Sequence, residues 1–402
     1  MSVDLATALS VLRERVRPLA PETVPLEKAA GRVLSEDVRS PLDVPPFARA
    51  AVDGFACRAE DTFGAGPFDP LSLRVVFEVL PGKLPPRALE RGEAARIMTG
   101  APVPDGADSV VMLEHAEEAE GEVRLVQPLP PGKNVALRGE DVARGDLVAA
   151  RGRRLRAEDV GVLASIRTRT VSVHRRPSVL VFSSGNELLD PLSDEPQRPG
   201  AIFDANGYVL EALAAREGAL VERGGIIPDD PAAIRAALSG ARADVTIGSG
   251  AASKGKEDFM PGLVRELGEL WVHGVSIRPG HPIGFGRIGE RLHFMLPGNP
   301  VAAWIGFRYF VRPALGMLSG LSPEAAFAPE RTRRAVLGKK IESVIGRTDF
   351  TRVRFTGERT VEPVRTGGAG MLTTLTRADG IVQVPRELEG LEEGTEVEVD
   401  LL

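Results

Sequence analysis

Three short turns carry most of the residues in this sequence that could do chemistry. Each follows an apolar run of strand length: SSGNEL (Ser183–Leu188), GSGAASKGKEDF (Gly248–Phe259) and PGNP (Pro297–Pro300). Their candidate ligand-binding residues are Ser184, Gly185, Glu187, Ser249, Gly250, Ser253, Lys256, Asp258, Gly298 and Asn299. One such turn is common, but three at one sheet edge favour a binding site over a purely structural role.

Glu187 and Asp258 predict a site for a hard cation, because Mg²⁺ takes a few carboxylates together with substrate phosphates. Asp229 and Asp230, which follow GGIIP, are further candidates. Asp258, and one of Asp229 and Asp230, also suit the N-cap of the helix that each precedes, so the structural alternative stays open.

PGNP predicts an anion site. Asn299 falls at the N-cap and Pro300 at the first helical position, which leaves backbone N–H groups free for a phosphate or oxyanion. The five histidines show no metal-ligand spacing, which argues against zinc, and only His281 lies in a loop of glycine and proline. GFGRIG (Gly284–Gly289) has dinucleotide-site spacing, but a strand follows it where a helix is required.

These turns need a parallel sheet to bring them together. Between Arg176 and Ser319, strand-like and helix-like runs alternate, which is typical of a parallel sheet with right-handed crossovers. Ligands bind outside the carboxyl ends of the strands in such sheets. The segment before it and the chain after about Arg331 show the period-two pattern of β domains.

Composition narrows the function classes. With 402 residues we expect several domains, and a net charge of −6 argues against a general nucleic-acid or acidic-membrane binder. The one cysteine, Cys57, excludes an internal disulfide and fits a reducing compartment. The opening MSVDLATALSVLRERV is amphipathic but carries charges among its leucines, so we expect neither a signal peptide nor a membrane span, and a cytoplasmic protein.

One stretch, ARIMTGAPVPDGADSVVMLE (Ala95–Glu114), places Thr99 on a stiff turn of small residues. It belongs to an ordered series: SPLDVPPFARAAVDGFA, GEAARIMTGAPVPDGADSVVMLE, GEDV, SSGNEL, KEDF, RPGHPIGFG, LPGNPVAA and GRTDFTRV. Over nearly its whole length the chain resembles the molybdopterin molybdenumtransferase family (MoeA), which includes the E domain of gephyrin.

The resemblance implies a multidomain α/β plus β fold. It consists of an N-terminal helical and extended dimerisation region (1–54 with 140–175), a small β-rich domain (55–139), a three-layer, parallel-rich molybdopterin-binding α/β domain (176–325) and a C-terminal β-barrel (326–402). It implies a homodimer whose active site lies between the α/β domain of one subunit and the small domains of the other. We expect the apolar stripe of the N-terminal helix and the Ser40–Cys57 region to hold this dimer.

The implied reaction hydrolyses adenylylated molybdopterin with Mg²⁺, releases AMP and inserts molybdate into the dithiolene. Possible protein partners are the molybdopterin adenylyltransferase and the recipient molybdoenzymes. The family roles fall on Asp53, Thr99, Asp141, Glu187, Asp258, Gly298, Asn299 and Arg347, with Glu187 and Asp258 on Mg²⁺ and Arg278, His281 and Lys256 near anions.

The sequence also departs from the family pattern. The usual Lys-Pro-Gly-Lys-Pro loop is Arg278-Pro279-Gly280-His281-Pro282, and Thr-Gly-Asp-Glu is Ser184-Gly185-Asn186-Glu187. Arg keeps the positive charge but not a compact ammonium. Three alternatives therefore stay open beside the transferase: a non-catalytic paralogue that binds or stores the pterin or its metal cofactor, a tungstate-specific transferase, and an interaction scaffold.

Overall fold

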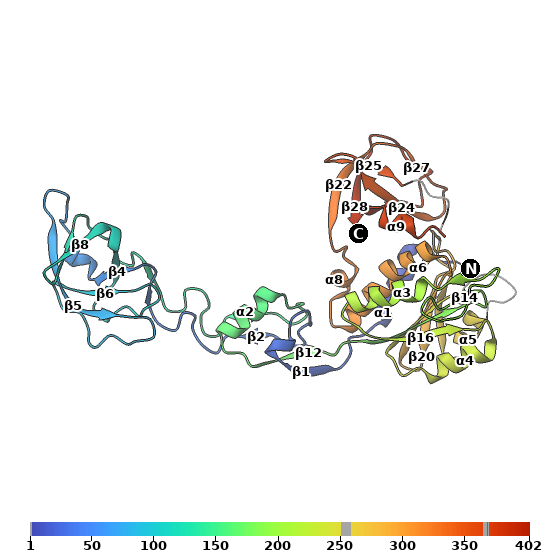
Figure 1. The fold of residues 1–402 in the computed structure, drawn as a ribbon, viewed down its shortest axis with the longest axis horizontal. Coiled ribbons are helices and arrows are strands. Elements are labelled where there is room, and N and C mark those ends of the chain that lie inside the picture. The colour runs from blue at the N-terminus through green and yellow to red at the C-terminus, as the bar shows by residue number, and fades with distance from the viewer. Residues whose placement is uncertain (1, 251–258, 365–367, 369) are drawn as a thin grey trace.

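The structure, a computed structural model, describes residues 2–250, 259–364, 368 and 370–402. The chain is elongated (Figure 1). A small β domain stands at one end, a slender region lies in the middle, and the α/β domain and the C-terminal β domain stand together at the other end.

The middle region is built from two distant segments of the chain. Its elements are β1 (Pro21–Pro25), η1 (Leu26–Lys28), β2 (Val38–Arg39), β11 (Leu147–Ala149), α2 (Ala157–Ser165) and β12 (Thr170–His174). β1 pairs with β12 and β2 with β11, both antiparallel. Leu34, Leu155 and Leu163 form its small core, so the two segments fold together.

The small β domain is a six-stranded sheet in the order β7-β4-β6-β5-β9-β8. Its elements are β3 (Arg49–Ala50), β4 (Gly54–Cys57), η2 (Ala59–Thr62), β5 (Leu71–Val79), β6 (Glu93–Ile97), β7 (Ser109–Met112), η3 (Leu113–His115), β8 (Ala116–Ala119), β9 (Glu122–Leu125) and β10 (Val135–Ala136). Phe55, Leu73, Val111 and Val123 pack in one of its cores, as the alternation of apolar residues along the strands requires.

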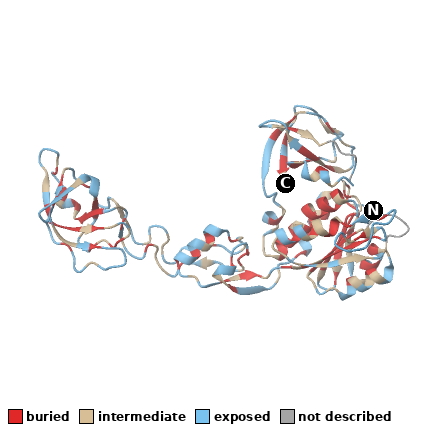
Figure 2. Ribbon diagram, in the orientation of Figure 1, coloured by how far each residue is buried: buried red, intermediate tan, exposed pale blue. Residues whose placement is uncertain are grey.

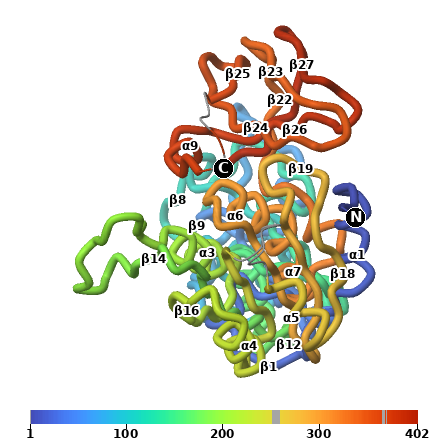
Figure 3. Tube along the Cα trace, turned by 90° about the vertical axis from the view of Figure 1, so that its right-hand side faces the viewer, coloured from blue at the N-terminus to red at the C-terminus, as the bar shows by residue number. Residues whose placement is uncertain are grey.

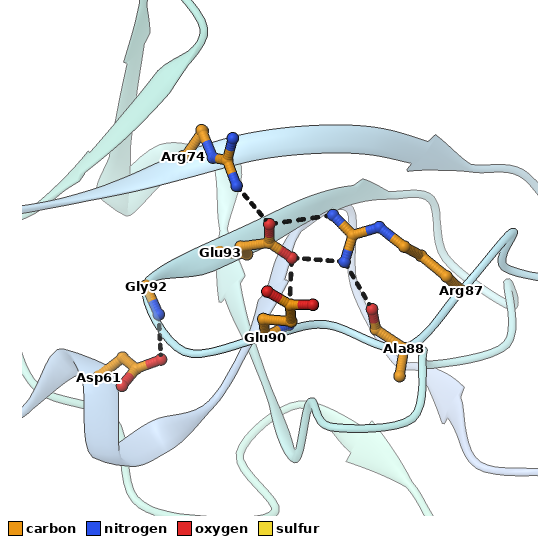
Figure 4. A network of polar contacts seen from close by, with 7 residues as sticks. All are labelled: Asp61, Arg74, Arg87, Ala88, Glu90, Gly92 and Glu93. Atoms are coloured by element: carbon orange, nitrogen blue, oxygen red, sulfur yellow. Dashed lines mark hydrogen bonds and ion pairs between the residues drawn. The ribbon is translucent and has the colours of Figure 1, made fainter.

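A buried carboxylate fastens this sheet (Figure 4). The Glu93 side chain, 3% exposed, accepts two hydrogen bonds from Arg87 (2.6 and 2.9 Å), one from Arg74 (2.6 Å) and one from the N–H of Glu90 (3.1 Å). The hydrogen bonds from Arg87, followed by that from Glu90, lower the pKa of Glu93 to about 2, against the opposing effect of burial. Glu93 therefore ties β5, β6 and the intervening loop together.

The α/β domain confirms the predicted parallel-rich sheet, in the order β16-β13-β17-β21-β20-β18. Its elements are β13 (Ser178–Ser184), β14 (Leu188–Leu189), β15 (Ile202–Phe203), α3 (Asn206–Arg216), β16 (Leu220–Ile227), α4 (Pro231–Gly240), β17 (Val245–Ser249), α5 (Met260–Leu267), β18 (Glu269–His273), β20 (Gly284–Ile288), β21 (Arg291–Leu296), α6 (Pro300–Gly306), the π-helix η4 (Phe307–Val311), α7 (Arg312–Leu318) and α8 (Pro323–Phe327). The first four strands of the sheet order are parallel. β20 pairs with β21, and β18 with β20, both antiparallel, so only β20 runs against the others.

Helices cover both faces of this sheet. Val181 packs with Leu210 of α3 and Ile305 of α6, whereas its neighbour Phe182 packs with Ile234 of α4 on the other face. Figure 2 shows the resulting buried layers in red. The three-layer arrangement follows from strands that are apolar on both sides.

The N-terminal helix α1 (Leu5–Arg15) corrects one expectation. Ala8, Leu12 and Val16 are buried in the core of the α/β domain of the same chain, beside residues such as Val272 and Phe310. The chain thus covers Leu12 and Val16 itself, so the stripe is not wholly free for a second subunit, whereas Leu5 and Leu9 are only partly buried and their part in a dimer stays a prediction.

The C-terminal domain confirms the predicted β-barrel. Its elements are β19 (Ile277–Arg278), β22 (Thr332–Leu337), β23 (Ile341–Glu342), β24 (Thr348–Phe355), β25 (Thr360–Pro363), α9 (Thr373–Thr376), β26 (Gly380–Val384), β27 (Gly390–Leu391) and β28 (Glu396–Leu401). The sheet runs β19-β24-β25-β22-β28-β26, and β26 pairs back to β24, which closes it. Across the described ranges of the chain, every helix is too short or too polar to cross a membrane.

We predict that Glu93→Gln makes the small domain less stable at neutral pH and less sensitive to acid. A carboxylate whose pKa is lowered from 4.5 to about 2 stabilises the fold above the ordinary glutamate range and loses this effect as the pH falls through that window. Cys57 is buried in this domain, so its labelling by an acid-active thiol reagent reports unfolding. The measurement is the urea concentration at half-maximal labelling, determined from about pH 6 to about pH 3.

The control for this measurement is Glu117→Gln, an exposed carboxylate on β8 with no ion-pair partner among the described residues. It should leave the midpoint and its pH dependence unchanged. Equal acid dependence in the wild type and in Glu93→Gln would contradict the prediction.

Candidate active site

The carboxyl ends of β13, β17 and β21 meet at one edge of the sheet and surround a cavity of about 540 Å³. Its wall is formed by Ser184, Glu187, Leu188, Ile202, Phe203, Asp204, Ala205, Asn206, Asp229, Ser249, Gly250, Pro282, Pro297, Gly298, Asn299, Pro300 and Gly370. The structure thus brings the first and third turns together with the described start of the second. Ser253, Lys256 and Asp258 lie outside the described residues, so their predicted roles stay predictions.

Carboxylates and a hydroxyl group form the polar side of the cavity. The Oγ of Ser184 donates to Oδ1 of Asp229 at 2.5 Å. The Glu187 carboxylate lies over Gly185, where a Cβ atom would stand 2.7 Å from Oε2, so a larger residue there would displace this carboxylate. Asp230 instead caps α4 by accepting from the N–H of Ala233 at 2.8 Å, which separates the roles of the two adjacent aspartates.

Asn206 joins the strand-end loops. Its Nδ2 donates to Oγ of Ser249 at 2.7 Å and to the carbonyl oxygen of Gly298 at 2.8 Å. Gly250 lies with φ of +92°, and a Cβ atom there would stand 2.1 Å from the carbonyl oxygen of Ser184. Only glycine permits this approach, which holds the loop after β17 against the end of β13.

Asn299 occupies the N-cap position of α6, as predicted, but its side chain caps no backbone N–H of that helix. It lines the cavity instead. Gly370 of the C-terminal domain lies close to it, since a Cβ atom at Gly370 would stand 3.8 Å from Oδ1 of Asn299. The cavity is therefore bounded by two domains of one chain.

The predicted anion-binding residues Arg278, His281 and Arg347 do not line this cavity. Arg278 donates to Oδ2 of Asp349, and Nε of Arg347 lies 3.4 Å from Oδ1 of the same carboxylate, which is 1% exposed. Nδ1 of His281 lies 2.9 Å from the carbonyl oxygen of Val275. Two guanidinium groups thus share one buried carboxylate.

Asp53 and Thr99 form a separate polar pair in the small β domain. Oδ1 of Asp53 accepts from Oγ1 of Thr99 at 2.6 Å and from the N–H of Thr99 at 2.7 Å. These hydrogen bonds, that from the side chain first, hold the pKa of the Asp53 carboxyl below its usual value. Asp141 lies on the return path of the chain, where its N–H donates to the carbonyl oxygen of Val44 at 3.0 Å.

The pair and the cavity lie far apart within one chain. β4 and β6, which flank Asp53 and Thr99, stand at one end of the molecule, and the α/β domain stands at the other (Figure 1). One chain by itself therefore does not bring these two groups of predicted site residues together.

Two polar residues of the cavity, Asp204 and Asn206, are not among the residues that the sequence analysis names. Oδ1 of Asp204 accepts from Oγ of Ser183 and from the N–H of Gly207, both at 2.9 Å. Asn206 makes the loop contacts described above. A polar cluster directly before a helix, FDANG, was the signal available in the sequence.

Comparison with known proteins accounts for the whole architecture. Residues 3–166 match the family described as MoeA N-terminal region (domain I and II), 180–317 match the probable molybdopterin binding domain, and 334–402 match the MoeA C-terminal region (domain IV).

Full-length relatives agree with these matches. The chain is 36% identical to molybdopterin molybdenumtransferase 2 of Mycobacterium tuberculosis over 97% of each chain. It is 34% identical to a putative molybdopterin biosynthesis protein of Methanocaldococcus jannaschii, over 94% of this chain and 92% of that one. A crystal structure of the molybdopterin biosynthesis MoeA protein of Pyrococcus horikoshii superposes with a TM-score of 0.87 at 31% identity over the full length of both chains. The chain belongs to the MoeA family and is a molybdopterin molybdenumtransferase of molybdenum cofactor biosynthesis.

Proposed function

We propose that this transferase acts on adenylylated molybdopterin with Mg²⁺, releases AMP and inserts molybdate. The observation that carries the proposal is the cavity at the carboxyl edge of the molybdopterin-binding domain, where Glu187, Asp229 and Ser184 gather. Water attacks the phosphoanhydride, so that AMP leaves and molybdopterin keeps its own phosphate. The two dithiolene sulfurs then bind the molybdenum of molybdate, the substrate that supplies the metal, and one displaced oxygen leaves as water with the two thiol protons.

The donor set of the cavity fits Mg²⁺. Glu187 and Asp229 offer carboxylate oxygens and Ser184 a hydroxyl oxygen, which are hard ligands. Within the described residues no three acidic, histidine or cysteine side chains form a complete metal cage. This agrees with an ion that completes its shell with water and substrate phosphates. When bound there, Mg²⁺ would offset the negative charge that develops on the phosphoanhydride.

The protein's own groups do the positioning. Asn206 fixes the loops that carry Ser249 and Gly298, so the cavity keeps its shape without a ligand. The Ser184 hydroxyl donates to Asp229 and so restrains that carboxylate in the cavity that Glu187 also lines. Such preorganisation lowers the cost of binding a charged substrate.

We propose further that the working unit is a homodimer. Asp53 and Thr99 are exposed at the far end of the chain from the cavity (Figure 1). A second copy can supply them, because an elongated subunit reaches across its partner. Within the Ser40–Cys57 region of the predicted interface, Phe47, Arg49 and Asp53 are exposed and can meet a partner.

The first prediction of the proposal concerns the two carboxylates. Glu187→Gln and Asp229→Asn should each lower Mg²⁺-dependent AMP release by about a hundredfold, since each removes a charge at the reacting phosphates. The measurement is AMP formation from adenylylated molybdopterin at saturating Mg²⁺ and molybdate.

The matched control for these variants is Glu290→Gln, whose side chain is 98% exposed in the turn between β20 and β21. It should retain full activity. Metallated cofactor formed at wild-type rates by both carboxylate variants would overturn the assignment. A wild type that binds the substrate without releasing AMP would favour the storage paralogue instead.

The second prediction concerns subunit sharing. Asp53→Asn and Glu187→Gln chains should each be nearly inactive alone, but coexpression should restore about a quarter of wild-type activity. Random pairing makes half of the dimers mixed, and each mixed dimer has one intact site of two. If the coexpressed mixture is dimeric by light scattering but no more active than either variant alone, the site is not shared between subunits.

The third prediction concerns the Asp53–Thr99 contact. Thr99→Val removes the Oγ1 donor but keeps the backbone one, so the pKa of the Asp53 carboxyl should rise toward its usual value. Carboxyl-carbon NMR titration of Asp53 measures this directly, and Thr99→Ser serves as the control that keeps the donor. Unchanged titration in the valine variant would show that the hydroxyl does not act on Asp53.

A further inference from the structure

The cavity has an apolar side that the proposed chemistry does not use. Leu188, Ile202 and Phe203, which we call the ribbon wall, line it from the two-stranded β14–β15 ribbon. Ile202 is 55% exposed and Phe203 is 45% exposed, so this apolar surface is open. Apolar residues that line the same cavity as the carboxylates suit a ligand that is apolar at one end and charged at the other.

The ribbon wall is held firmly rather than loosely. The N–H of Ile202 donates to the carbonyl oxygen of Glu187, and the N–H of Asp204 donates to that of Leu189, both at 2.9 Å. The wall is thereby fixed to the same segment that carries Glu187. In Figure 3 the green loop beyond β14 projects from the body, and the ribbon forms its base.

A single guanidinium group lies at the carboxyl end of both strands of the ribbon. β14 is followed by Asp190 and β15 by Asp204, and Nη2 of Arg223 lies 3.8 and 3.7 Å from these two carboxylates. Arg223 also lies 3.5 Å from the ring centre of Tyr208, whose hydroxyl donates to Asp190 at 2.9 Å. These contacts hold the carboxyl end of the ribbon beside β16, the strand that carries Arg223.

We propose that the ribbon wall is the surface against which a flat, fused nitrogen heterocycle of the substrate stacks, an inference that rests on the proposed function. The phosphates then lie toward Glu187, Asp229 and Ser184, on the polar side of the same cavity. A cavity of about 540 Å³ lies within the range of small-molecule sites. Aromatic and branched aliphatic side chains bind flat heterocycles through such contacts.

The substrate offers two rings of this chemistry, the pterin and the adenine. Both are flat, fused and rich in nitrogen, so the wall recognises what they share. Separate probes distinguish them: 6-hydroxymethylpterin carries the first ring alone, and AMP carries the second. Ribose 5-phosphate is AMP without its base and serves as the matched ligand without a ring.

The test uses the full chain with Ile202→Ser and Phe203→Ser combined. We expect the affinity for 6-hydroxymethylpterin or for AMP, measured by calorimetry, to fall roughly tenfold or more. The affinity for ribose 5-phosphate should not change. Phe203→Leu, which keeps the apolar volume but loses the ring, should show a smaller loss of the same ligand and guards against a folding defect in the double variant.

The control is Phe63→Ser combined with Phe68→Ser, two exposed phenylalanines of the small domain that do not line the cavity. Wild-type affinity of the Ile202/Phe203 variant for both ring probes would overturn the proposal. A double variant that forms a weaker dimer but binds both rings as the wild type does would also overturn the proposal, because the wall would then belong to a subunit contact. AMP release by the wild type is measured in a separate experiment. If AMP is not released but ring binding still depends on the ribbon wall, the proposed reaction is wrong and the proposed ring-binding role of the wall is retained.

Discussion

The candidate site depends on one close approach of backbone to backbone. The loop that leaves β17 crosses the end of β13 at Gly250, where a Cβ atom would collide with the carbonyl oxygen of Ser184. This contact positions Ser249, whose hydroxyl accepts a hydrogen bond from Asn206. Asn206 also donates to the carbonyl oxygen of Gly298 and so positions that loop. Three strand-end loops thus become one surface. Any side chain at position 250 would push the second loop away and open the cavity floor.

Guanidinium–carboxylate pairs hold the domains in the arrangement that this surface requires. Arg175 binds both oxygens of Asp244, at 2.6 and 2.5 Å, where the middle region meets the start of β17. Arg308 of η4 binds Asp400 of β28 where the α/β domain meets the barrel, and both side chains are largely buried. Bidentate pairs of this kind fix orientation as well as distance. The second pair helps to keep the barrel, and with it Gly370, beside Asn299 of the sheet edge.

The separation of the Asp53–Thr99 pair from the cavity is the observation behind the proposed homodimer. The Asp53–Thr99 contact is complete within the small domain, and the cavity is complete within the α/β domain, but Figure 1 places them apart. The turn of small residues around Thr99 lets both its N–H and its hydroxyl reach one carboxylate oxygen. Because the pair is exposed and its two hydrogen bonds are made within one chain, it can contact a second subunit, as the proposed homodimer requires.

The sequence by itself determined the local elements and the edge at which ligand residues gather. Alternation of apolar runs with helical runs predicted the parallel sheet, and the period-two pattern predicted both β domains, because these patterns depend on neighbours along the chain. The turns at Ser184, Ser249 and Asn299 followed from strand ends in the same way. Family motifs identified the transferase for the same reason, since they are read in chain order.

Only the tertiary structure decided which of several equivalent side chains face the cavity. Asp229 lines it while adjacent Asp230 caps a helix, and Asn206 links the strand-end loops rather than capping α3. Arg278 and Arg347 share the buried Asp349 instead of lining the cavity, and part of the apolar stripe of α1 is covered by its own chain. Each of these outcomes depends on contacts between residues far apart in sequence, whose geometry no local pattern encodes. Local sequence therefore identified candidate residues, and packing between distant segments decided which of them line the cavity.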